Sequence, residues 1–87
     1  MPASVSVIIP TYNRRELLSR ALDSVMRQTR PADEIIVVDD GSDDGTAEMV
    51  AQNYPTVICV QHQNHGISYS RNRGVDRATG TWIAFLD

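Results

Sequence analysis

The sequence predicts an α/β fold in which helices cover both faces of a parallel sheet, giving three layers. Short apolar runs alternate with segments of helical periodicity, in the order β-α-β-α-β-α-β. The apolar runs also lack polar alternation, which is typical of strands that are buried on both faces. Parallel strands that are joined through helices have right-handed crossovers, so the helices are expected on the faces of the sheet.

The first strand is expected at residues 5–9, and a polar group at residues 10–13 follows it. Thr11 or Asn13 is expected to cap the first helix, and Pro31 is expected to end it. The apolar residues of this helix recur at spacings that define one helical face. They are Leu17, Leu18, Ala21, Leu22, Val25 and Met26.

The second strand is expected at residues 35–38, directly before Asp39 and Asp40. Residues 42–44 then open a second helix with acids in its first turn, where the helix dipole favours them, and Pro55 ends it. The predicted apolar face of this helix consists of Ala47, Val50, Ala51 and Tyr54.

The last third of the chain repeats the same alternation. A third strand is expected at residues 57–61 and a third helix at 67–78, with Gly80 near its C-terminus. A fourth buried strand is expected at 82–86, ending in Asp87. Because the chain stops at the tip of a predicted strand, it is expected to be an incomplete domain of a longer protein.

Composition limits the classes of partner. The chain has 87 residues and a net charge of −3, which gives no electrostatic footprint for nucleic acid. Arg71, Arg73 and Arg77 are expected to form a solvated face rather than a phosphate-binding patch. The sequence therefore predicts no nucleic-acid partner.

Cysteine usage and hydropathy bear on the compartment. The single Cys59 lies in an apolar run and is expected to be a buried, inert thiol. One cysteine can form neither a disulfide framework nor a cysteine zinc site. No signal-peptide pattern is present, and no apolar run reaches membrane-spanning length. We therefore expect no membrane segment in this chain and a reducing, cytoplasmic setting, with any attachment to the inner face of the membrane made by regions beyond Asp87.

Polar side chains gather where the predicted strands end. Asp39 and Asp40 follow the second strand, and Gly41 allows the backbone to turn sharply. Because ligands of open parallel sheets bind outside the carboxyl ends of the strands, these acids are expected at the mouth of a cleft, near Thr11 and Tyr12. Adjacent carboxylates can accept hydrogen bonds from a base or ribose, or bind a hard divalent cation. The structural alternative is a helix-capping acid beside a turn acid.

Other candidate positions carry weaker signals. Tyr12 either packs within its loop or offers its ring as a stacking platform, with Thr11 and Asn13 as polar partners. His62 and His65 are expected to be solvated, as a lone histidine in a loop usually is. Their H-x-x-H spacing, without a third ligand, is weak evidence for a metal site. Neither the dinucleotide fingerprint G-x-G-x-x-G nor the phosphate loop G-x-x-x-x-G-K-[ST] is present.

Six segments, taken in order, closely resemble the nucleotide-binding half of inverting glycosyltransferases of family 2, which have the Rossmann-like GT-A fold. The segments are 5–13 (VSVIIPTYN), 22–28 (LDSVMRQ), 34–46 (EIIVVDDGSDDGT), 64–66 (NHG), 70–74 (SRNRG) and 78–87 (ATGTWIAFLD). The resemblance covers almost the whole chain. It implies that residues 1–87 are the nucleotide-sugar-binding half of a GT-A glycosyltransferase domain.

The resemblance also implies a ligand and its contacts. The donor would be a nucleoside-diphosphate sugar, with a UDP-sugar expected first. In the family, the loop that matches residues 10–12 contacts the base and ribose, and the acid that matches Asp40 or its neighbour Asp39 accepts a hydrogen bond from the base. The segment at 70–74 lines the nucleotide pocket, and Ser70 departs from the usual A-R-N-x-G. The implied nucleotide-sugar-binding residues are Pro10, Thr11, Tyr12, Asn13, Asp39, Asp40, Gly41, Gly66, Arg71, Asn72 and Asp87.

The resemblance implies a divalent metal, Mn²⁺ or Mg²⁺. Asp87 matches the first acid of the family's D-x-D motif and is the expected metal ligand. The family's catalytic base lies much further along the chain. The implied reaction is a single inverting displacement at the anomeric carbon, in which that base deprotonates a hydroxyl of a sugar, lipid or protein acceptor. Residues 1–87 are thus expected to be inactive alone, and to self-associate through an exposed strand edge.

Two other classes of protein share parts of this pattern. A phosphoacceptor receiver domain also has acids at strand ends, but its acid pair follows the first strand and it needs a lysine, which this chain lacks. The main alternative is a catalytically inactive nucleotide-binding or interaction module of the same fold. Asp39, Asp40 and Asp87 count against it, since an inactive copy need not retain acids at strand ends.

Overall fold

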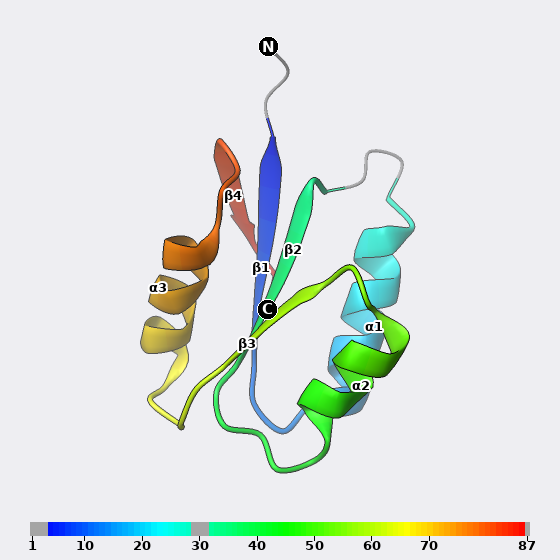
Figure 1. Cartoon of the computed structure of the whole chain (residues 1–87), viewed down its shortest axis with the longest axis vertical. Coiled ribbons are helices and arrows are strands. Elements are labelled where there is room, and N and C mark those ends of the chain that lie inside the picture. The colour runs from blue at the N-terminus through cyan, green and yellow to red at the C-terminus, as the bar shows by residue number, and fades with distance from the viewer. Residues whose placement is uncertain (1–3, 29–31, 87) are drawn as a thin grey trace.

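The computed structural model describes residues 4–28 and 32–86, and within them the expected alternation of strands and helices is present (Figure 1). The elements are β1 (Val5–Thr11), α1 (Arg15–Met26), β2 (Glu34–Asp39), α2 (Thr46–Asn53), β3 (Ile58–Gln61), α3 (Ile67–Arg77) and β4 (Trp82–Phe85). The predicted order β-α-β-α-β-α-β is therefore confirmed.

The four described strands form one parallel sheet in the order β3-β2-β1-β4. β1 pairs with β2 from Ser6 opposite Glu34 to Thr11 opposite Asp39. Because all strands run in the same direction, the loops that follow β1, β2 and β3 leave the sheet together, at its lower edge in Figure 1. This register places the ends of the two central strands side by side.

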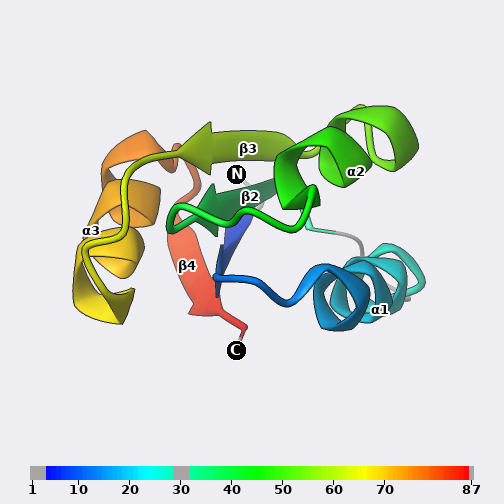
Figure 2. The ribbon, with the colours of Figure 1, turned by 90° about the horizontal axis from the view of Figure 1, so that it is seen from below.

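Helices cover both faces of the sheet, which confirms the three-layer prediction. α1 and α2 lie on one face and α3 lies on the other (Figure 2). Ile9 packs with Leu22 and Val50 on the side of α1 and α2. Its neighbour Ile8 clusters with Val38 on the side of α3. Neighbouring residues of a strand pack into the clusters on opposite faces of the sheet, because their side chains alternate between the two faces.

α3 approaches the sheet closely at Gly74. A Cβ atom at this position would lie 2.4 Å from Cγ2 of Ile8, well inside the contact distance of two carbon atoms. A larger residue would therefore push the helix away from β1. Ser70 lies one turn earlier on the same face of α3 and is fully buried. The close approach at Gly74 therefore also keeps the first turn of α3 against the sheet.

The start of α1 differs from the prediction, since neither Thr11 nor Asn13 caps it. Asp44, in the β2–α2 loop, does so instead: its Oδ2 accepts a hydrogen bond from the Arg15 amide at 3.1 Å. Its Oδ1 accepts one from the Thr46 amide at 3.2 Å, at the start of α2. One carboxylate thus satisfies free amides at two helix N-termini. The predicted stop at Pro31 lies outside the described residues.

The predicted apolar faces of the helices are too broad. Leu17 and Met26 of α1 are 57% and 41% exposed, and Ala51 of α2 is exposed. The buried residues of α1 are Leu18, Leu22 and Val25, a narrower stripe than the sequence suggested.

Within the described part of the chain, no helix is long and apolar enough to cross a membrane.

β4 corrects the expectation of a fourth buried strand. Its four residues are exposed, with Trp82 at 64% and Phe85 at 47%. Among the described strands it pairs only with β1, at the edge of the sheet. An edge strand leaves one row of backbone groups unpaired. The apolar side chains that led to the expectation of burial are therefore exposed in this chain.

A polar network around Glu34 lies at the end of the sheet where β1 and β2 begin. Its Oε1 accepts hydrogen bonds from the Ser6 hydroxyl at 2.8 Å and from the Thr79 amide at 2.9 Å. The Ser6 hydroxyl also accepts one from the Gly80 amide at 2.9 Å. The Thr79 amide is the main cause that lowers the pKa of Glu34, while partial burial opposes it. This network ties the α3–β4 loop to β1 and β2.

Candidate functional site

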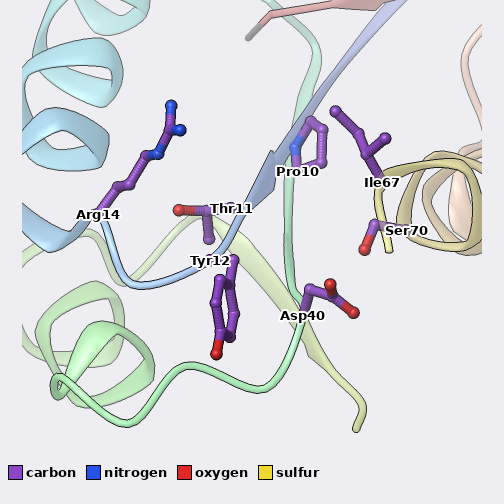
Figure 3. Close-up of a pocket in the computed structure, with 7 residues that line it drawn as sticks. All are labelled: Pro10, Thr11, Tyr12, Arg14, Asp40, Ile67 and Ser70. Atoms are coloured by element: carbon purple, nitrogen blue, oxygen red, sulfur yellow. The ribbon is translucent and has the colours of Figure 1, made fainter. Parts of the chain in front are cut away.

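A pocket of about 230 Å³ opens at the edge where the central strands end. Figure 3 shows it between the β1–α1 loop on one side and the first turn of α3 on the other. It is smaller than the ~300–1,000 Å³ of pockets that enclose whole ligands, so it suits one part of a larger ligand. Its lining residues are Pro10, Thr11, Tyr12, Arg14, Asp40, Ile67 and Ser70.

Asp40 is the acid that faces this pocket. Its Oδ1 accepts a hydrogen bond from the His65 amide at 2.7 Å, and its Oδ2 accepts one from the Gly66 amide at 3.1 Å. Its own amide donates to the Thr11 carbonyl at 2.9 Å. The residue is only 6% exposed, so the two backbone donors replace much of the water that a carboxylate would otherwise bind.

Asp39 has a different role, which the sequence could not distinguish. Its Oδ1 accepts a hydrogen bond from the Ser42 amide at 3.0 Å and so closes the turn after β2. It is 2% exposed and does not line the pocket described above. For this residue, the turn-forming alternative considered from the sequence is the one that the structure supports.

The β3–α3 loop is held tightly against the end of β2. Gly41 has a φ of +83°, and a Cβ there would lie 2.9 Å from the Asn64 amide nitrogen. The side-chain amide of Asn64 donates to the Asp40 carbonyl at 3.3 Å. The Asp39 carbonyl accepts a hydrogen bond from the His62 amide at 3.1 Å. This close approach requires glycine and brings the two amide donors to Asp40.

The β1–α1 loop supplies the opposite wall. Thr11 is 8% exposed, whereas Tyr12 is 48% exposed, and both line the pocket. Asn13 has a φ of +50° and binds the β2–α2 loop: its amide donates to Ser42 Oγ at 2.8 Å, and its Oδ1 accepts from the Asp43 amide at 2.9 Å. Asn13 therefore shapes the loop and is not among the lining residues.

The glycine and arginine positions predicted on α3 lie around the pocket rather than in it. Gly66, with a φ of +93°, begins the helix and donates its amide to Asp40. The Arg71 guanidinium lies 5.9 Å from the centre of the Phe85 ring, towards β4. Asn72 is exposed, and neither residue lines the pocket.

Of the lining residues, Arg14 and Ile67 were not expected from the sequence, and Ser70 was expected at the pocket only as part of the segment 70–74 that the resemblance implies. Ile67 and Ser70 are three residues apart, which places them on one face of α3. This helical spacing was the sequence signal that could have identified Ile67.

His62 was expected to be solvated, and this expectation is wrong. Its side chain is 8% exposed and lies beside the Asp40 carboxylate, with 3.3 Å between Nδ1 and Oδ1. Its Nε2 lies 3.1 Å from Ser70 Oγ. The ring also stacks edge-on against Tyr69, with 4.7 Å between centroids. Nothing in the local sequence distinguishes this histidine from the exposed His65 nearby.

The described residues do not form a metal site, since they contain no group of three acids, histidines or cysteines that could hold an ion. Asp87, the expected ligand, lies outside the described residues. Asp39 and Asp40 are adjacent in sequence but bind different backbone amides.

Cys59 is half-buried, and burial is the main cause that raises the pKa of its thiol to about 11. The thiol is therefore protonated at neutral pH, as an inert thiol would be.

Known glycosyltransferases are similar to this chain in sequence. Residues 6–87 match the family model described as glycosyl transferase family 2. The chain is 43% identical over 86 residues to the uncharacterized glycosyltransferase YibD of Escherichia coli K12, covering 95% of this chain and 25% of the relative. It is 39% identical over 88 residues to the putative teichuronic acid biosynthesis glycosyltransferase TuaG of Bacillus subtilis, covering 95% and 34%.

Two solved structures share the fold and about a third of the sequence. S. aureus TarS 1-349 superposes with a TM-score of 0.86 at 32% identity, over 97% of this chain and 27% of that one. The mannosyltransferase PcManGT from Pyrobaculum calidifontis, in complex with GDP-Man and Mn²⁺, gives 0.78 at 32% identity, over 95% and 26%. The fold is therefore the GT-A fold that the sequence predicted. The chain spans about a quarter to a third of the length of these relatives.

Proposed function

This chain belongs to glycosyl transferase family 2, and we propose that residues 1–87 form the donor-binding half of an enzyme that transfers a sugar from a nucleoside-diphosphate sugar to an acceptor hydroxyl with inversion. A UDP-sugar is the first candidate for the donor. The acceptor would be a sugar, a lipid or a protein, bound by the other half of the enzyme. We place the reaction in the cytoplasm or at the inner face of the membrane.

The observation that carries this proposal is the buried Asp40 carboxylate in a pocket whose other wall is the exposed Tyr12 ring. A carboxylate can accept about four hydrogen bonds, so Asp40 keeps acceptor capacity for an N–H group of a base. An aromatic ring can stack on the face of any base. The pocket holds one part of a ligand, which agrees with a base whose ribose and diphosphate extend outside it.

The described residues bind and orient the donor, and the base that deprotonates the acceptor hydroxyl would come from the other half of the enzyme. The proposal includes a divalent cation, Mn²⁺ or Mg²⁺, with Asp87 as a ligand. Such a cation offsets the negative charge of a departing diphosphate. Support for it comes from the Mn²⁺ in the related mannosyltransferase, because the described residues do not provide a site.

Calorimetric titration of the full-length protein tests the proposal. We expect UDP or GDP to bind, Mn²⁺ to strengthen the binding, and inorganic pyrophosphate to bind more weakly than either nucleotide, because it lacks the base. If no nucleotide binds with or without Mn²⁺, the inactive interaction module becomes the better interpretation.

A further inference from the structure

Ile67 is an apolar side chain that is open to solvent in the pocket at the end of the central strands. The pocket takes two lining residues from α3, namely Ile67 and Ser70. Ser70 is fully buried, whereas Ile67 is 52% exposed. Figure 3 shows the Ile67 side chain across from Pro10, which lies at the end of β1. Ile67 therefore provides the open surface of the α3 wall.

An exposed isoleucine does not need a function, since single apolar side chains are common on protein surfaces. Val75 is such a case: it is 41% exposed on the same helix and does not line this pocket. Ile67 differs because it lines a concave surface that also contains the buried Asp40 carboxylate. An apolar wall beside a hydrogen-bonding group is typical of sites for small organic ligands.

The contacts of neighbouring residues fix the position of Ile67. The Gly66 amide donates to Asp40 Oδ2 at 3.1 Å, and the Gly66 carbonyl accepts a hydrogen bond from the Ser70 amide at 3.2 Å. Isoleucine is also β-branched, which restricts its χ1 angle in a helix. The apolar wall is therefore in place before a ligand binds, and its ordering adds little to the cost of binding.

The chemistry of the pocket fits the base of a nucleotide better than its diphosphate. A diphosphate would be repelled by the Asp40 carboxylate, and the Ile67 side chain offers it no hydrogen bond. A base carries its N–H groups at its edge and has two flat faces of low polarity. With its edge at Asp40, a base would turn one face to the β1–α1 loop, which holds Tyr12, and the other to Ile67.

We propose that Ile67 is a further binding residue of the donor site, whose side chain packs on the face of the base that is turned towards α3. This inference rests on the proposed function, because it requires a base in the pocket. It adds a residue and a property of that residue. An apolar contact with the face of a ring does not read the groups at its edge, so Ile67 contributes equally to pyrimidine and purine nucleotides.

Two substitutions of the same shape isolate the apolar contact. Ile67→Val shortens the side chain, and Ile67→Thr has the shape of valine with a hydroxyl in place of one methyl group. Val75→Thr is the matched control, because it makes the same exchange at an exposed position of α3 that does not line the pocket. The affinities of UDP, GDP and inorganic pyrophosphate are measured by calorimetry on the full-length protein with Mn²⁺ present, and melting temperatures are recorded.

We expect Ile67→Thr to bind nucleotides about threefold to tenfold more weakly than Ile67→Val, because a hydroxyl that is covered without a partner is unfavourable. The factor should be the same for each nucleotide that wild type binds. The affinity for pyrophosphate should not change, since pyrophosphate has no base. Val75→Thr should bind all three ligands as wild type does, and the two threonine variants should melt at similar temperatures.

Several outcomes would overturn the inference. Equal nucleotide affinities in Ile67→Val and Ile67→Thr would exclude the contact. A matching loss for pyrophosphate, together with a lower melting temperature than that of Val75→Thr, would show that Ile67 only supports the fold. Different factors for UDP and GDP would contradict the equal contribution to both bases.

The same titrations separate this inference from the proposed function. Wild type that binds a nucleotide no more tightly than pyrophosphate would show that no base occupies the pocket, which would overturn the role of Ile67 while leaving a diphosphate-binding enzyme. Wild type that binds no nucleotide would overturn the proposed function and this inference with it.

Discussion

Gly41 and Asn64 lie so close together that a Cβ on Gly41 would stand 2.9 Å from the Asn64 amide nitrogen. This contact joins the end of β2 to the β3–α3 loop, which carries the amides that bind Asp40. The shape of the site therefore depends on a position where no side chain fits.

Gly41→Ala should lower the free energy of unfolding by more than backbone strain alone, which costs about 1–2 kcal/mol for a left-handed residue. The added Cβ must also displace the backbone at Asn64, so nucleotide affinity should fall as well. Urea denaturation and calorimetry measure both effects. Gly45→Ala is the matched control: its φ is +82°, but its new Cβ would meet only side-chain ends, those of Arg15 at 3.1 Å and Glu48 at 4.0 Å. Equal losses in the two variants would argue against the packing explanation.

Asp40→Asn should reduce donor affinity by about 1–3 kcal/mol, the cost of leaving a buried polar group without its partner. The amide group replaces an acceptor by a donor, which then faces either a backbone amide or the N–H of the base. Asp39→Asn is the informative comparison, because an asparagine retains the Oδ1 that closes the turn to Ser42. It should keep most of the affinity. A larger loss in Asp39→Asn than in Asp40→Asn would reverse the assignment of the two acids.

Glu34 should make the stability of the fold depend on pH in the acid range. Its pKa is lowered from 4.5, first by the Thr79 amide and also by the Ser6 hydroxyl. A carboxyl group with a lowered pKa stabilises the folded state above its unfolded pKa, and this contribution disappears as the pH falls through the folded pKa. Glu34→Gln should therefore be less stable than wild type at neutral pH, and the difference should shrink below 4.5. Urea denaturation at neutral pH and at a series of acid pH values measures the difference in unfolding free energy between wild type and Glu34→Gln. Glu16→Gln is the control, because Glu16 is exposed. A deficit that stays constant with pH would contradict the role of ionisation.

The isolated chain 1–87 should self-associate through β4. Trp82, Ile83 and Phe85 are 64%, 38% and 47% exposed on an edge strand, and such edges pair with other chains. Sedimentation velocity should show oligomers whose fraction rises with concentration, and Ile83→Lys should reduce it, because a charge on an edge strand opposes pairing. A monodisperse monomer that melts above about 65 °C, the top of the usual range for mesophilic domains, would show that this edge is stable when open.

The sequence by itself determined the order of the elements and the edge at which the site lies. Apolar runs without alternation and helical spacing are local properties, and right-handed crossovers then leave few arrangements of the chain. The placement of Thr11, Tyr12 and Asp40 at one edge follows from the common direction of parallel strands. These features needed no knowledge of side-chain contacts.

Only the tertiary structure decided which acid faces the pocket and what surrounds it. Asp39 and Asp40 look equivalent in sequence, but the strand pairing aims one at the turn and the other at amides 25 and 26 residues further along the chain. The burial of His62, the capping of α1 by Asp44 and the exposure of β4 also depend on partners that are distant in sequence or on an open sheet edge. Periodicity reports the neighbours of a residue within one element, whereas these features are set by how separate elements come together.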